Sequence, residues 1–181
     1  MPVIADVALA APDVADYWLG DGGAFPNNPQ LPLVVYRGAV PEGDPDALEQ
    51  VFQANQWPRG WRNGVFDFDH YHSNAHEVLG VYRGSARLRF GGQEGVVIDA
   101  QAGDVLVLPA GTAHKRLGAS ADFSVVGRYP AGQEDYDLCY GEADERPASD
   151  RRIAEVPLPA ADPVYGAEGP LMDLWQQGRR G

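Results

Sequence analysis

The sequence has little cysteine and little basic charge. Cys139 is the single cysteine in 181 residues, so no disulfide can form within the chain, and we expect a reducing, cytoplasmic location. Lysine and arginine together number 14 against 26 aspartates and glutamates, and the formal net charge is −12 at pH 7. This charge repels polyanions at long range. We therefore expect neither nucleic acid nor an anionic membrane surface as a partner.

Long apolar runs, internal repeats and low-complexity tracts are also missing. The N-terminal segment 1–12 has small apolar residues but no basic stretch, and Asp6 interrupts it, so no leader peptide and no membrane span are expected. Hydrophobic residues make up 44% of the chain and charged residues 22%, which is typical of a globular protein. At this length we expect one domain over 1–181 with a sizeable core.

The central part of the chain has the alternation and composition of β-strands. Val, Leu, Phe and Tyr recur there, and glycines stand at most of the breaks. In 86–90 the apolar and basic residues alternate, as on a strand with one buried face, whereas 104–109 is apolar at consecutive positions, as on a strand covered on both sides. Short strands at this spacing predict an all-β antiparallel sandwich or barrel. The candidate strands are 65–72, 76–83, 86–90, 95–99, 104–109, 114–118 and 122–129.

The two ends differ from this centre. Segment 43–56 predicts a helix, because Asp44 can cap it, Pro45 suits the first position, and the apolar residues recur at helical spacing. We expect a core barrel over about 60–130, an N-terminal extension over 1–59 with a short strand and this helix, and a C-terminal arm over 131–181. The arm is expected to wrap the barrel or a partner subunit, and 170–177 predicts a short terminal helix.

Three of the four histidines lie in one short stretch, GVFDFDHYHSNAHEVLGVYRG. On a strand over 65–72, Phe66, Phe68, His70 and His72 would share one face, so an apolar surface would lead to two imidazoles. A hairpin to 76–83 would bring Glu77 to them. Two imidazoles and a carboxylate are ligands of divalent transition metals, and a distant strand can complete the set.

The order of glycines, histidines and the glutamate resembles the two signatures of the cupin superfamily. The first matches from Gly64 through His70, His72 and Glu77 to Gly84. The second matches at Gly103, Pro109, Gly111 and His114, although Gly118 stands where that signature commonly ends in Asn. The sequence is similar to small bacterial single-domain cupins. This resemblance implies a cupin-type antiparallel jelly-roll barrel with one or two peripheral helices, and metal ligation by His70, His72, Glu77 and His114.

The same resemblance implies a small-molecule substrate at one or two open metal positions. We favour an enzyme, a dioxygenase or other oxidoreductase with Fe(II), because a carboxylate and imidazoles with open positions suit oxygen chemistry; Mn, Ni, Zn and Cu remain open. A metal-dependent isomerase or decarboxylase and a non-catalytic binding or sensing cupin are the alternatives. A homodimer is expected.

Several other residues near this stretch or elsewhere in the chain also have expected roles. His76 is expected at the rim or turn of the barrel rather than on the metal, with proton relay as its catalytic alternative, and Glu77 itself can act as a base. Counting by two from His114, Arg116 points inward, where its guanidinium can bind a substrate carboxylate. Trp57 and Trp61 are expected beneath the helix, with a lid over the pocket as the alternative. Cys139 is expected to be structural.

Overall fold

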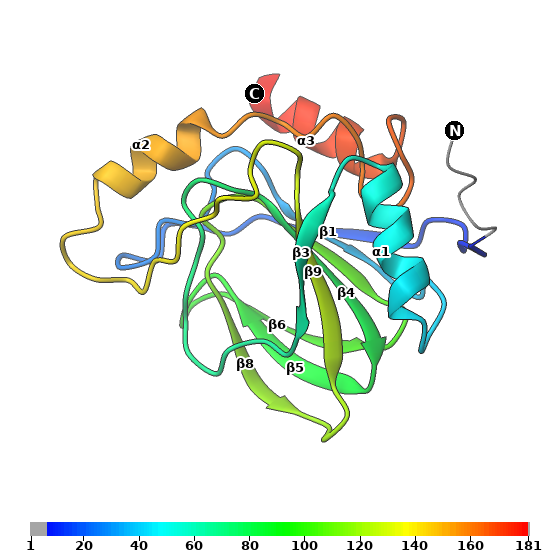
Figure 1. The fold of residues 1–181 in the computed structure, drawn as a ribbon. Coiled ribbons are helices and arrows are strands. Elements are labelled where there is room, and N and C mark those ends of the chain that lie inside the picture. The colour runs from blue at the N-terminus through cyan, green and yellow to red at the C-terminus, as the bar shows by residue number, and fades with distance from the viewer. Residues whose placement is uncertain (1–6, 181) are drawn as a thin grey trace.

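The computed structural model describes residues 7–180, which form two antiparallel sheets facing each other, with helices on the outside (Figure 1). This is a cupin-type jelly-roll barrel, so the predicted fold class is confirmed. The larger sheet has the strand order β1 (Val14–Tyr17), β2 (Leu33–Tyr36), β7 (Val105–Leu108), β4 (Glu77–Arg83), β9 (Ser124–Tyr129) and β3 (Arg59–Asn63). The smaller sheet has the order β6 (Val96–Gln101), β5 (Ser85–Phe90) and β8 (His114–Ala119).

The hydrophobic core lies between the sheets and continues on the outer face of the larger one. On β5 the alternation is as predicted, since Leu88 and Phe90 are buried between the sheets and Arg87 is exposed. On β7, Leu106 packs between the sheets and Val107 packs on the outer side, so both faces of this strand are covered. The strands β1 and β2 come from the N-terminal extension, so the larger sheet extends beyond the 60–130 core.

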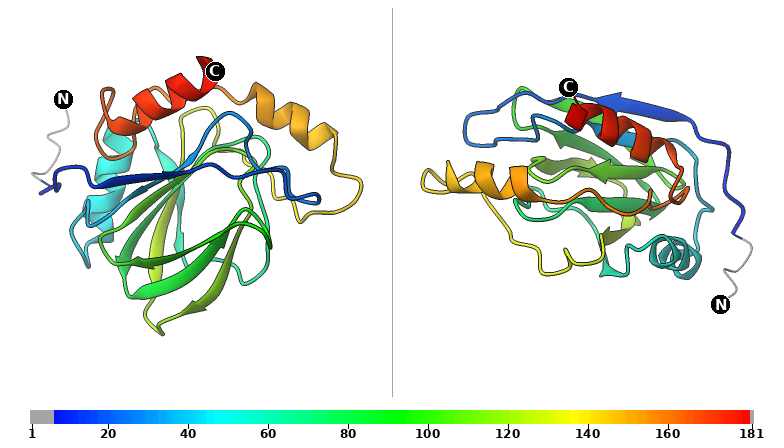
Figure 2. Two further views of the ribbon diagram at one scale, coloured as in Figure 1. Left: turned by 180° about the vertical axis from the view of Figure 1, so that it is seen from behind. Right: turned by 90° about the horizontal axis from the view of Figure 1, so that it is seen from above.

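Helices cover the outer face of the larger sheet (Figure 2). The predicted helix α1 (Pro45–Ala54) is confirmed, with the Asp44 carboxylate accepting a hydrogen bond from the Ala47 backbone at 3.0 Å. Its buried stripe packs over Gly80 of β4, where an added Cβ would lie 2.6 Å from Leu48 Cδ2. The close approach of helix and strand therefore favours glycine, because a Cβ at this position would displace the Leu48 side chain.

The C-terminal arm packs on the barrel of its own chain. The terminal helix α3 (Pro170–Arg180) is anchored by Trp175, whose indole donates to the Pro32 carbonyl at 2.9 Å. A further helix, α2 (Ala148–Glu155), was not predicted, because Ile153 is its single buried apolar side chain and gives no helical repeat in the sequence. None of the helices among residues 7–180 is long and apolar enough to cross a bilayer.

The predicted strand over 65–72 and its hairpin with 76–83 are wrong. Segment 64–72 crosses one end of the barrel as an irregular chain, held by isolated bridges from His70 to His114 and from Tyr71 to Cys139. The strand β4 pairs instead with β7 and β9. The strand that precedes this segment in the chain is β3. The sequence did not reveal it, because it is a largely exposed edge strand without apolar alternation.

Candidate metal centre

Four polar side chains meet at one end of the barrel, two from strand ends and two from the irregular segment 64–72 that crosses it. His114 is the first residue of β8, and Glu77 is the first residue of β4. The irregular segment is tied to β8 by paired backbone hydrogen bonds between His70 and His114, of 2.9 and 3.3 Å. The His72 carbonyl accepts a third bond from the Gly111 backbone at 2.7 Å. The residues of both cupin signatures therefore converge in space.

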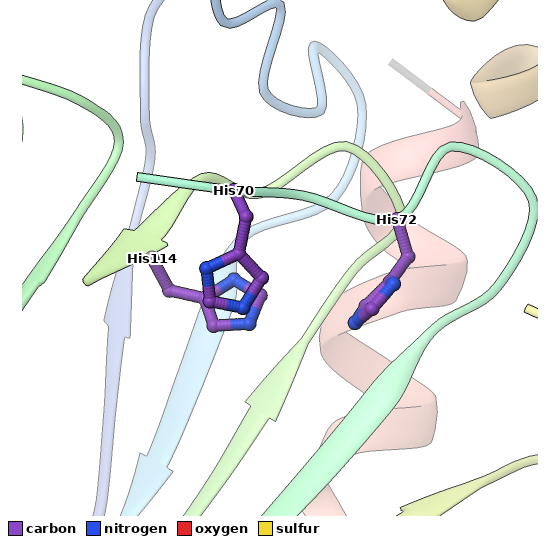
Figure 3. Close-up of side chains that lie close together, drawn as sticks. All are labelled: His70, His72 and His114. Carbon is purple, nitrogen blue, oxygen red and sulfur yellow. The ribbon is translucent and has the colours of Figure 1, made fainter. Parts of the chain in front are cut away.

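The three imidazoles are oriented so that one ring nitrogen of each faces a common point (Figure 3). The Nδ1 atoms of His70 and His114 lie 2.9 Å from the carbonyl oxygens of Phe68 and Thr112, and Nδ1 of His72 contacts the Asp137 carbonyl. A carbonyl oxygen only accepts, so each Nδ1 carries the proton and each neutral ring directs its Nε2 lone pair inward. One ligand atom from each ring lies within 4.8 Å of the other two.

Glu77 lies against two of these imidazoles. Its carboxylate is 2% exposed, with Oε1 at 3.3 Å from Nε2 of His114 and Oε2 at 3.4 Å from Nε2 of His72. The Tyr129 hydroxyl donates to Oε2, whereas Oε1 is buried and receives no hydrogen bond from any described residue. An unpaired carboxylate oxygen facing imidazole lone pairs is unfavourable unless a cation lies between them.

These distances fit a single metal ion. Two ligand atoms each about 2.1 Å from one ion lie about 3.0 to 3.4 Å apart at octahedral or tetrahedral angles. The contacts of Glu77 with His72 and His114 fall in this range. His70, His72 and His114 can therefore hold a metal, and Glu77 lies beside two of them, with Oε1 nearest His114 and Oε2 nearest His72 and bonded to Tyr129. The predicted ligand residues are brought together in the structure.

Electrostatics favour the protonation states that metal binding needs at Glu77 and His70, but not at His72. Burial would raise the pKa of Glu77, but the neighbouring imidazoles of His72 and His114 outweigh it, so its pKa lies below the usual value. Burial, followed by the charge of His114, lowers the pKa of His70 to about 3. At His72, burial lowers the pKa and the Glu77 carboxylate raises it, and the net result is a raised pKa. A proton held between His72 and Glu77 therefore competes with a metal ion for this site.

A cavity of about 280 Å³ opens beside the centre. The Trp61 indole lines it and donates to the Tyr129 hydroxyl at 2.9 Å. The expectation that Trp61 packs beneath the helix is therefore wrong, whereas Trp57 is fully buried in the core cluster that includes the helix side chains, as predicted. Tyr136 stacks on Tyr129 with ring centroids 4.0 Å apart. Sequence reasoning missed Tyr129 and Tyr136, because only the β4–β9 register and the path of the C-terminal arm bring them to the site.

Comparison with known proteins identifies a relative that matches most of the chain. Protein YjlB of Bacillus subtilis (strain 168), described as uncharacterised, is 42% identical over 159 residues, which is 88% of this chain and 94% of YjlB. The chain belongs to the YjlB family. No protein-family model matches it.

Solved structures resemble this YjlB family member only in part. A vicilin from Solanum melongena is 25% identical, with 44% of this chain and 24% of the vicilin covered, at a TM-score of 0.35. An oxalate decarboxylase is 20% identical, with 60% of this chain and 23% of that chain covered, at a TM-score of 0.34. Procruciferin from Brassica napus is 19% identical, with coverages of 42% and 20% and a TM-score of 0.36. The YjlB family member thus spans about a quarter or less of these chains, and the likeness does not bear on its activity.

His76 does not face the metal ligands. It is fully buried, so the predicted rim position is wrong. Its Nδ1 accepts from the Ala110 backbone at 2.8 Å, its Nε2 lies 3.1 Å from the Pro157 carbonyl, and its ring packs against Trp175. Burial lowers the pKa of His76 to about 3, so the ring is neutral. Nδ1 is engaged within the barrel and Nε2 with the C-terminal arm, which leaves neither nitrogen for proton relay.

Arg116 points inward, as strand parity predicted, but does not line the cavity. It lies opposite Leu88 on β5, and its Nε donates to the Val65 carbonyl at 3.1 Å. This guanidinium borders a separate hollow on the other side of segment 63–66. Phe66 and Phe68 do lie beside the His70 ring, as predicted, but they are 50% and 39% exposed and so are not part of the core.

Proposed function

We propose that this YjlB family member is a metal-dependent enzyme that oxidises a small molecule with dioxygen, with Fe(II) as the first choice of metal. The observation that carries the proposal is the buried, unpaired Oε1 of Glu77 facing imidazole nitrogens whose lone pairs point inward, beside an open cavity. Three imidazoles and one carboxylate leave up to two positions of an octahedral ion free. The metal would supply the binding positions for substrate and dioxygen.

The protein side chains have distinct roles in this proposal. The backbone carbonyls of Phe68, Asp137 and Thr112 hold the imidazoles in the ligating tautomer. Tyr129 holds Oε2 of Glu77, which favours a fixed ligand over a carboxylate that leaves the metal to act as a base. The apolar side chains that line the cavity exclude water from the reacting molecules. In a dioxygenase reaction both oxygen atoms enter the product, so no external reductant is needed.

Metal loading followed by oxygen measurement tests the proposal. Protein stripped with a chelator is loaded anaerobically with Fe(II), and oxygen consumption is followed with β-diketones, catechols, thiols and hydroxy acids. We expect about one iron per chain and substrate-dependent oxygen uptake. His114→Gln removes one ligand and should lose both, whereas His76→Gln changes a histidine outside the centre and should retain both.

The expected metal binding and the expected oxygen uptake can each fail without the other. Absence of metal uptake in the unmodified protein would refute the metal centre. One equivalent of bound iron without oxygen uptake above the His114→Gln level would refute the oxidative activity and favour the binding or sensing alternative.

A further inference from the structure

The wall of the cavity is mostly apolar; apart from the metal ligands, its polar groups belong to Trp61, Asn63, Tyr129 and Tyr136. None of the described residues that line it is a lysine or an arginine. The Trp61 indole and the Tyr129 hydroxyl are bonded to each other, and the Asn63 side-chain oxygen accepts from the Gly64 backbone at 2.8 Å. The main wall residues are Trp61, Val65, Phe66, Leu79, Tyr136 and Leu138. Such a wall offers little compensation to a substrate rich in hydroxyl groups or charges.

The charge of the loaded centre sets a limit on the charge of its ligand. A divalent ion contributes two positive charges, Glu77 contributes one negative charge, and the three imidazoles are neutral in the ligating tautomer. The net charge of +1 is balanced by one negative charge on the substrate. A second negative charge would face the apolar wall without a cation to pair with it.

Aromatic side chains extend the apolar surface from the cavity to the outside. We call Phe66, Phe68, Tyr136 and Tyr140 the aromatic rim; they are 50%, 39%, 38% and 50% exposed. Phe66 and Phe68 stack with centroids 4.8 Å apart, and the Tyr140 ring lies 5.9 Å from that of Phe68. Phe66 also packs edge-on against His70 at 5.1 Å. A planar ring projecting from a metal-bound group would meet this rim.

We infer that the substrate is a compound with a single acidic group that chelates the metal through two neighbouring oxygens and carries an aromatic or other planar apolar body. An enolised aryl diketone or a singly ionised catechol has this chemistry, whereas dicarboxylates, phosphates and free sugars do not. The inference rests on the proposed metal centre. It extends that proposal by assigning the substrate class to the cavity wall and the aromatic rim.

Calorimetric binding to the Zn(II)-loaded protein tests the inference without oxygen chemistry. The probes are benzoylacetone, which has a diketone and a phenyl ring, acetylacetone, which lacks the ring, and oxalate, a dianion without a ring. We expect benzoylacetone to bind at least about tenfold more tightly than acetylacetone, because the ring buries apolar area on the aromatic rim. Oxalate should bind more weakly than benzoylacetone.

A rim variant and a matched control identify the surface responsible. The double substitution Phe66→Ser and Phe68→Ser should weaken benzoylacetone binding more than acetylacetone binding, so that the advantage of the phenyl ring is lost while zinc is still bound. Trp18→Ser changes an aromatic residue that is 57% exposed and lies outside the cavity, and should retain the advantage. Equal affinities for the two diketones, tighter binding of oxalate, or a rim variant that keeps the preference would overturn the substrate class alone. Absence of zinc uptake would overturn the metal centre as well.

Discussion

The hydrogen bond from Tyr129 to Glu77 leads to a prediction about metal affinity. The Tyr129 hydroxyl is buried, donates to Oε2 of Glu77 and accepts from the Trp61 indole. Tyr129→Phe removes the hydroxyl that fixes the carboxylate and leaves Oε2 without this hydrogen bond. Loss of an outer contact of this kind lowers metal affinity about 10- to 100-fold. This corresponds to about 1.4 to 2.7 kcal/mol of binding free energy, within the range of about 1.5 to 3 kcal/mol for hydrogen bonds to charged groups.

The assay is competition for Zn(II) or Co(II) against a chromophoric chelator at pH 7.5. Tyr136→Phe is the matched control, because its ring stacks on Tyr129 but its hydroxyl makes no hydrogen bond with the described residues. We expect the Tyr136 variant to bind metal as the unmodified protein does. If Tyr129→Phe also binds within about twofold of the unmodified protein, the role given to Tyr129 is refuted.

Three further predictions concern the barrel and its arm. Burial, aided by neighbouring carboxylates, raises the pKa of the Cys139 thiol, so at pH 8 it should react slowly with a disulfide reagent in the native protein and rapidly after denaturation; fast native reaction would contradict the docked arm. Gly80→Ala should lower the free energy of unfolding by about 1 to 3 kcal/mol through overpacking against Leu48, as measured by urea denaturation, and an unchanged value would contradict the tight α1 contact. His76→Leu leaves the Ala110 N–H unpaired and should cost about 1 to 3 kcal/mol, with His76→Gln costing less; equal stabilities would argue against the structural role.

Local alternation of apolar and polar residues, together with motif spacing, was sufficient to predict much of the barrel from the sequence. Strand β5 could be predicted because one face is core and the other is solvent, and β7 because both faces are covered. Helix α1 carries its own capping and apolar stripe. In contrast, β3 is a polar edge strand and α2 has one apolar anchor, Ile153, so neither has a periodic signal.

The metal-ligand prediction came from signature spacing, and its strand-based explanation was only partly right. His70 and His72 face the centre although their segment is not a strand, because backbone bonds to His114 and Gly111 set its path. The environment of His76 could not be predicted, since Trp175 and Pro157 reach it from the C-terminal arm. Contacts between segments distant in the sequence leave no local pattern.

Anomalous diffraction from crystals of the Co(II)-loaded protein, recorded at the cobalt absorption edge, tests the central claim most directly. The account predicts one peak, about 2.0 to 2.2 Å from Nε2 of His70, His72 and His114 and from Oε1 of Glu77. No peak at the barrel end, or an ion bound without Glu77, would contradict it.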